Sequence, residues 1–128
     1  MAVTRLGLAA GLLLAMMVDA SAANVKAKSG VERMIGRNGS INSRTCQAMS
    51  LQPAIAQAAR HGSVEFRLNT FKVTNRSSHC LGQEYRGFGI YYRSQPGFRG
   101  TDQVVISTFL NNGRTDVRTD YTYVITVQ

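Results

Sequence analysis

Tryptophan is absent from this 128-residue chain, and proline, cysteine and histidine occur only twice each. Acidic residues are also scarce, with seven Asp and Glu against fifteen Lys and Arg, which gives a formal net charge of +8. Zinc sites need three or four clustered His, Cys or carboxylate ligands, and calcium sites need several converging carboxylates. Because the two histidines, His61 and His79, stand well apart in the sequence, we expect no metal site, no calcium requirement and no cofactor.

Catalytic patterns are lacking as well. General acid–base catalysis usually needs paired carboxylates, or a carboxylate with a histidine. The acids after the first twenty residues are scattered, and no Gly-x-Ser-x-Gly motif occurs. These acids are Glu32, Glu65, Glu84, Asp102, Asp116 and Asp120. We therefore expect a non-catalytic protein, with an enzyme as the weakest alternative.

The N-terminal residues are typical of an export signal. Arg5 precedes the uncharged apolar run LGLAAGLLLAMMV (residues 6–18), and small residues follow, with cleavage expected after Ala22 or Ala23. An uncleaved anchor is the alternative, but a membrane-spanning helix needs about 20 apolar residues and this run is shorter. Residues 1–23 are thus predicted to be a signal peptide, leaving an exported chain without a membrane span in the periplasm or outside the cell. Cleavage removes one arginine and one aspartate, so the net charge is unchanged.

The two cysteines, Cys46 and Cys80, both lie in the exported part. In an oxidising compartment an even number of cysteines indicates a disulfide, and closing this loop would contribute about 3–4 kcal/mol. Two free buried thiols are the alternative. Residues 24–45 are rich in Gly, Ser and Asn, with one possible strand at residues 31–35, and are interpreted as a flexible N-terminal arm. Residues 46–128 are interpreted as one domain.

Apolar residues alternate through most of this domain, which is typical of strands with one buried face. The alternation runs through SVEFRL (63–68), GFGIYYRS (87–94), QVVISTFL (103–110) and residues 117–127. Asn112-Gly113 lies between the last two runs and predicts a tight hairpin turn, because both residues accept a positive φ. The pattern predicts an all-β fold with a final antiparallel hairpin.

Residues 53–60 do not fit this alternation. Pro53 followed by alanines, with Gly62 as a stop, is typical of a short helix. Propensity alone favours the helix, whereas a strand here depends on the tertiary context.

The stretch SQPGFRGTD (residues 94–102) is the most distinctive motif. Together with ARHGSV (59–64) and the ending YTYVITV (121–127), it resembles the bacterial immunoglobulin-like, cadherin-like modules of exported proteins, which carry P-x-H-G-(S/T)-V and G-F-x-G-T-D elements. Ala59 stands where that family has proline, and Val104 and Ile106 stand where Phe and Tyr are usual. The resemblance implies an immunoglobulin-like antiparallel β-sandwich over residues 46–128, and it favours an extended segment at residues 54–59.

The residue types of this motif suit a structural turn. Pro96 fixes φ, Gly97 supplies the positive φ of a type II turn, and Phe98 can fold over the end of the core. Gly100 lets the backbone pass close to that ring, and Asp102 can accept hydrogen bonds from backbone N–H groups. A catalytic role for Asp102 is the lesser alternative.

Arginines and tyrosines are interleaved late in the chain. Arginine beside exposed aromatic side chains could bind phosphate or sugar-acid polymers. The alternative is a solvated sheet face with tyrosines packed beneath arginine stems. The possible anion-binding residues are Arg86, Arg93, Arg99, Arg114, Arg118 and Tyr91.

We therefore expect a non-catalytic binding or adhesion module at the cell envelope, which contacts a protein or an anionic envelope polymer. We do not expect a nucleic-acid partner. The alternative function is a small periplasmic inhibitor of an acidic hydrolase, since a basic inhibitor would be repelled by a basic target.

Overall fold

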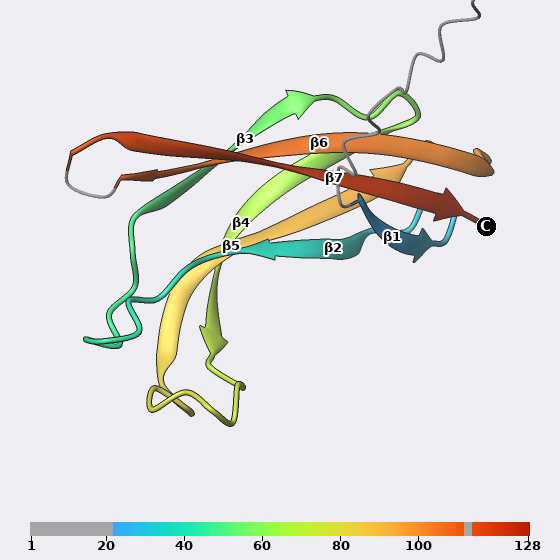
Figure 1. Ribbon diagram of the computed structural model, residues 1–128. Helices are drawn as coiled ribbons and strands as arrows, with labels where there is room; N and C mark the ends of the chain where they lie inside the picture. The colour runs from blue at the N-terminus through green and yellow to red at the C-terminus, as the bar shows by residue number, and fades with distance from the viewer. Residues whose placement is uncertain (1–21, 112–113) are drawn as a thin grey trace, which may run out of the picture.

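The chain folds into two β-sheets packed face to face. The computed structural model describes residues 22–111 and 114–128, and this part contains seven strands and no helix (Figure 1). One sheet has the order β1-β7-β6-β3 and the other the order β2-β5-β4. The strands are β1 (Ala22–Ala27), β2 (Arg33–Asn38), β3 (Leu51–Gln57), β4 (Gly62–Lys72), β5 (Glu84–Ser94), β6 (Gly100–Asn111) and β7 (Asp116–Val127). The predicted all-β sandwich is confirmed.

The core lies between the sheets and follows the alternation of the sequence. One set of alternate side chains on each strand points inward, so Val104 and Ile106 of β6 meet Ile90 and Tyr92 of β5. All four side chains are almost completely buried, as are the inward residues of the C-terminal half of β7. The predicted hairpin of the last two strands is confirmed, because β6 and β7 pair antiparallel along their whole length.

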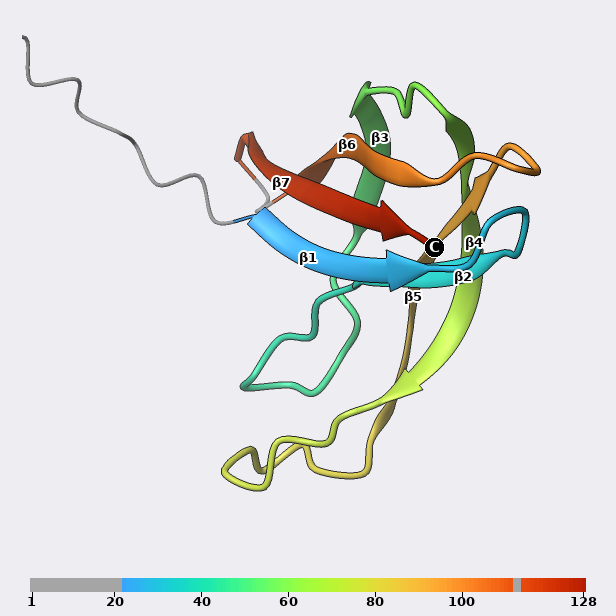
Figure 2. The same cartoon turned by 90° about the vertical axis from the view of Figure 1, so that its right-hand side faces the viewer.

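The flexible arm predicted for residues 24–45 is wrong. This segment contains most of β1, which pairs in parallel with β7, and all of β2, which pairs antiparallel with β5 (Figure 2). Their inward side chains, such as Ala27 and Ile35, belong to the buried core. Within the described residues the sandwich therefore includes two strands that precede Cys46. The predicted signal peptide falls almost entirely on residues 1–21, which lie outside the described residues.

Residues 51–57 form strand β3, so the extended interpretation of this segment is confirmed over the helix. Pro53 pairs with Thr108 of β6, and β3 lies at the edge of its sheet. An edge strand tolerates proline because one side of its backbone needs no ladder hydrogen bond. Tertiary pairing with β6 thus overrides the local helical propensity.

The predicted disulfide joins two connections at one end of the molecule. Cys46 lies between β2 and β3, Cys80 lies between β4 and β5, and their sulfurs are bonded with the Cα atoms 5.5 Å apart. The covalent link holds the two connections together beside the ends of β2 and β4. Cys80 is fully buried.

At this same end the two sheets diverge. Figure 1 shows the β6–β7 hairpin and the far ends of β4 and β5 running in different directions. Inward-facing side chains beyond the core are therefore incompletely covered, and Leu68, Val117 and Tyr121 are 50%, 46% and 47% exposed. The sandwich has a closed end and an open end. The described residues contain no helix of the length and apolarity that crossing a bilayer would require.

Candidate functional site

The closed end is built from the SQPGFRGTD motif. The backbone N–H of Phe98 donates to the carbonyl of Gln95 at 3.1 Å, and Gly97 has a φ of 86°, as the predicted type II turn requires. The ring of Phe98 is half-buried against the core and stacks on His61 with centroids 4.1 Å apart. Gly100, with a φ of 138°, runs close to that ring, and a Cβ there would lie 3.5 Å from it. The turn and its aromatic cover are structural.

Asp102 binds the two motif elements together. Its carboxylate accepts hydrogen bonds from the backbone N–H groups of Arg60, His61 and Gln103 at 2.9–3.1 Å. The hydroxyl of Tyr92 donates to the same carboxylate at 2.8 Å. Both carboxylate oxygens are therefore occupied by structural donors. The side chain is also buried, with 3% of its surface exposed.

The electrostatics of this pair follow from burial and hydrogen bonding. Burial would raise the pKa of Asp102, but the hydrogen bonds from Tyr92 and from the three backbone amides outweigh it and hold the pKa below its usual value. Burial, together with the neighbouring carboxylate, raises the pKa of Tyr92. At neutral pH the pair is therefore an ionised carboxylate and a neutral phenol.

The possible anion-binding residues do not form one surface. Arg86, Tyr91 and Arg93 lie on β5, whereas Arg118 lies on β7 in the other sheet. Arg99 precedes β6, and Arg114 lies between β6 and β7. The grouping was wrong because nearness in sequence does not tell which sheet a strand joins.

Tyr91 and Arg93 lie within a network of opposite charges on the outer face of the three-stranded sheet. Arg67 donates to Glu32 at 2.6 and 2.7 Å and to Glu65 at 2.7 Å, while Arg93 is 3.9 Å from Glu32. The guanidinium of Arg67 also lies over the ring of Tyr91, 4.4 Å from its centroid. Two arginines thus meet two glutamates, so the charges of Arg67 and Arg93 are balanced within this network. For Tyr91, the packed arrangement beneath an arginine is the one observed.

Two further predicted features have different outcomes. The hairpin residues Asn112 and Gly113 lie outside the described residues.

Within the described part, Cys46, His79 and Cys80 form a group whose potential ligand atoms lie within 4.8 Å of one another, but both cysteines are bonded in the disulfide. Their sulfurs are therefore not thiolate ligands in this structure.

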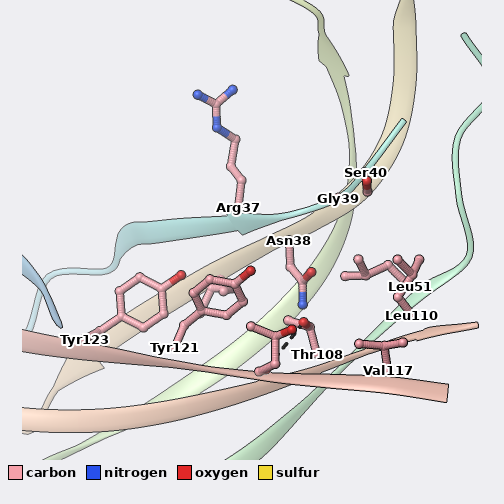
Figure 3. Close-up of a pocket in the computed structure, with 12 residues that line it drawn as sticks. Arg37, Asn38, Gly39, Ser40, Leu51, Thr108, Leu110, Val117, Tyr121 and Tyr123 are labelled. Atoms are coloured by element: carbon pink, nitrogen blue, oxygen red, sulfur yellow. Dashed lines mark hydrogen bonds between the residues drawn. The ribbon is translucent and has the colours of Figure 1, made fainter. Parts of the chain in front are cut away.

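The open end contains a cavity that the sequence did not indicate. Its volume is about 250 Å³, and inward side chains of β2, β6 and β7 line it, together with Leu51 of β3 (Figure 3). A second cavity of about 280 Å³ lies beside it and shares Asn38, Gly39 and Leu51. Leu110, Val117 and the tyrosines of β7 supply the apolar part of the first cavity, and the rest is polar. Arg37 points away from it (Figure 3).

Asn38 is the one buried polar side chain of the described residues whose nitrogen lacks a partner. It ends β2, and its pairing with Phe88 places it on the inner face of the sheet. The side chain is 6% exposed, points between the layers, and its Nδ2 has no acceptor (Figure 3). An unpaired buried donor costs about 1–3 kcal/mol. The cavity therefore combines apolar and polar wall residues with a buried amide whose nitrogen has no acceptor among the described residues.

Comparisons with protein families, with curated proteins and with solved structures gave no match to this chain. The site must therefore be interpreted from its own geometry.

Proposed function

We propose that this protein is an exported, non-catalytic binding module of the cell envelope that holds a partner protein at the open end of its β-sandwich. The observation that carries the proposal is the Nδ2 of Asn38, which has no acceptor among the described residues and lies in a cavity at the point where the two sheets diverge. Ligand sites are typically concave and mainly apolar, with a few convergent polar groups.

The surroundings of the carboxylates support a non-catalytic role. Asp102 accepts four hydrogen bonds within the fold. Asp120 accepts from Ser107 at 2.6 Å and from Arg118 at 2.9 Å, and Glu32 and Glu65 are joined by Arg67. Carboxylates held this way serve as structural acceptors rather than as acid–base catalysts.

The order of strands supports an immunoglobulin-like assignment of the sandwich. In that fold the second, fifth and fourth strands share a sheet, and the third, sixth and seventh share the other. The orders β2-β5-β4 and β7-β6-β3 agree with this arrangement. The first strand differs from the constant-type domain, because β1 joins β7 instead of β2. The disulfide also differs, since it links two connections rather than two strands.

Contact with an anionic polymer through the Arg/Tyr residues is not part of this proposal. Those residues are divided between two sheets, and two of them lie beside Glu32 and Arg67. A partner held in this cavity, from which Arg37 points away, should also bind with little dependence on salt, whereas an anionic polymer should be released as ionic strength rises.

Site-specific photo-crosslinking tests the proposal. The full chain, produced in an exporting host so that any leader is processed, would carry a photo-crosslinking amino acid at Tyr121 or, as a matched control, at exposed Ser63. We expect a partner from envelope extract to be crosslinked from position 121 and not from 63, equally at 50 mM and at 500 mM NaCl. Equal crosslinking from both positions, or crosslinking lost at 500 mM NaCl, would contradict the proposal.

A further inference from the structure

The disulfide lies within a group of side chains that contains the ligands of a metal site in masked form. His79 precedes Cys80, and its Nε2 lies 3.7 Å from the Cys80 sulfur. The ligand atoms of Cys46, His79 and Cys80 all lie within 4.8 Å of one another. Two thiolates and one imidazole are a ligand set that Zn²⁺ prefers. The wide separation of the two histidines in the sequence does not exclude this site, because it needs only one of them.

The spacing of these atoms is close to that of a tetrahedral zinc site. Zn–S distances of about 2.3 Å and Zn–N distances of about 2.0–2.1 Å place sulfur and nitrogen about 3.5 Å apart, and two sulfurs about 3.8 Å apart. The Cys80 sulfur and His79 Nε2 already have nearly the first separation. The two sulfurs, which are bonded to each other, would have to move apart on reduction to reach the second. Because His79 is exposed, water can supply the fourth ligand.

The loop that contains Cys46 is a small hairpin held by its own backbone. Ile41 and Ala48 form an isolated β-bridge, and the N–H of Cys46 donates to the carbonyl of Asn42 at 2.8 Å. Within the described residues, Cys46 is the one non-glycine residue with a positive φ, at 59°. Such a conformation is unfavourable for a residue with a Cβ and persists only where the surrounding structure imposes it. The hairpin, and not only the disulfide, therefore holds Cys46 in its position.

The loop that contains Cys80 is held in the same way. The N–H of Cys80 donates to the Ser78 hydroxyl at 3.1 Å, and its carbonyl accepts from the N–H of Gln83 at 3.0 Å. Val73 and Gln83 pair at the base of this loop. The strand pairs of both sheets also form independently of the disulfide, since it joins two connections. Reduction should therefore leave the three ligands close together on a folded protein.

Reduction would begin at Cys46, which is half-buried, whereas Cys80 is fully buried. A thiolate of a dithiol reductant would attack the Cys46 sulfur, form a mixed disulfide with it and release Cys80 as a thiolate. The second thiolate of the reductant then attacks its own sulfur in the mixed disulfide, which releases Cys46 and leaves the reductant as a disulfide. A buried thiolate is unfavourable without a compensating charge. The reduced pair therefore favours the uptake of a cation.

We propose that Cys46, His79 and Cys80 form a zinc site that exists only in the reduced protein. In the complete reaction the dithiol reductant becomes a disulfide, both cysteine thiolates and Nε2 of His79 bind one Zn²⁺, and two protons are released to water. A disulfide oxidant reverses the reaction: the oxidant is split into two thiolates, the Cys46–Cys80 bond forms again and Zn²⁺ leaves. This inference goes beyond the proposed function and does not depend on the cavity at Asn38.

Cobalt binding tests the site directly. Co²⁺ binds to the same nitrogen and sulfur ligands as Zn²⁺, and its thiolate complexes absorb visible light. The full chain, produced in an exporting host, is reduced with a phosphine, desalted under argon and titrated with Co²⁺ and then with Zn²⁺. We expect one Co²⁺ per reduced chain, displaced by one Zn²⁺, and none on the oxidised chain. Glutathione disulfide should release the bound Zn²⁺ to a chromogenic chelator.

Matched variants identify the histidine ligand. His79→Gln removes the imidazole and keeps the disulfide, and His61→Gln makes the same change at the closed end, where His61 stacks on Phe98. Loss of a hydrogen-bond partner of a metal ligand already weakens metal binding about tenfold to a hundredfold. Loss of the ligand itself in His79→Gln should therefore weaken Zn²⁺ binding by at least about tenfold, whereas His61→Gln should leave it unchanged.

Four results would overturn the proposal. The first is a reduced chain that binds neither Co²⁺ nor Zn²⁺ stoichiometrically, and the second is an affinity for Zn²⁺ that His79→Gln does not change. The third is an oxidised chain that binds Zn²⁺ as tightly as the reduced one. The fourth is a reduced chain whose circular dichroism spectrum has lost its β-sheet signal even with Zn²⁺ present.

Discussion

Replacing Asp102 with asparagine tests whether this carboxylate holds the closed end together. The side chain is almost completely buried, and it accepts four hydrogen bonds, three of them from backbone amides. In Asp102→Asn one oxygen becomes an NH₂ group, which faces donors instead of accepting from them. Suppose the NH₂ group takes the place of Oδ2, which accepts from His61 and Tyr92. The Tyr92 hydroxyl can then turn its hydrogen away and accept from the NH₂ group, but the backbone N–H of His61 is left facing a second donor.

The cost follows from these contacts. Hydrogen bonds to a charged group contribute about 1.5–3 kcal/mol each and neutral ones about 0.5–1.5 kcal/mol, while an unsatisfied buried donor costs about 1–3 kcal/mol. In the variant the remaining hydrogen bonds are made to a neutral amide and are weaker, and the N–H of His61 is left without an acceptor. Together these two effects should lower the free energy of unfolding by about 2–4 kcal/mol. That is a large part of the 5–15 kcal/mol typical of a domain.

Urea unfolding followed by circular dichroism measures this loss, and Glu84→Gln is the matched control. Glu84 is exposed, and its ion pair with Lys72 is long, with 4.0 Å between Nζ and Oε1. Its replacement should therefore cost less than about 1 kcal/mol. If Asp102→Asn is no less stable than Glu84→Gln, the proposed role of the carboxylate is wrong.

The pH dependence gives a second measurement of the same group. Because folding lowers the pKa of Asp102, its contribution is fully present above the unfolded value of about 3.9 and is lost as pH falls through the lower folded value. The stability difference between the natural protein and Asp102→Asn should therefore be constant at neutral pH and shrink below about pH 4. An equal difference at pH 3 and pH 7 would contradict this reasoning. Comparing the two proteins cancels the contributions of the other acids.

Three further changes test how much the disulfide, Gly62 and Phe98 contribute to the stability of the fold. Replacing Cys46 and Cys80 together with serine should lower the free energy of unfolding by about 3–4 kcal/mol, measured by urea unfolding, and a loss below 1 kcal/mol would show that the link contributes little. Gly62→Ala should cost more than about 2 kcal/mol because its Cβ would lie 2.5 Å from the carbonyl oxygen of Arg93, whereas Ser63→Ala beside it should change the midpoint little. Phe98→Ala should lower the melting temperature by removing a half-buried ring, a loss of about 1–2 kcal/mol, and an unchanged melting temperature would show that the ring does not seal the core.

The sequence predicted those parts of the fold whose signals are local. Alternation identified β4 to β7, because each of these long strands has a face that the core requires to be apolar. The turn at Pro96 and Gly97 was also predicted correctly, since turn chemistry depends on neighbouring residues. β1 was missed, and β2 was predicted only as a possible strand at residues 31–35, because both are short strands in a segment rich in Gly, Asn and Ser. Their partners also lie far away in the sequence.

The candidate site could not be predicted in the same way. Asn38 stands before Gly39 and Ser40, a composition typical of a loop. Only its register with Phe88 on β5, and the divergence of the sheets beyond it, place the amide in a cavity. The prediction of one arginine surface was wrong for a related reason, because alternation indicates which face of a strand a residue lies on but not which sheet the strand joins. Edges and cavities depend on pairing between distant strands.

The two ends of the sandwich differ in whether their buried polar side chains are fully hydrogen-bonded. At the closed end every hydrogen bond offered to Asp102 is accepted, and the surrounding turn is fixed by Pro96 and covered by Phe98. At the open end Asn38 keeps an unpaired donor whose cost of about 1–3 kcal/mol is no larger than the contribution expected from the nearby disulfide, about 3–4 kcal/mol. Under the proposed function, an acceptor supplied by the bound partner would pair with this amide.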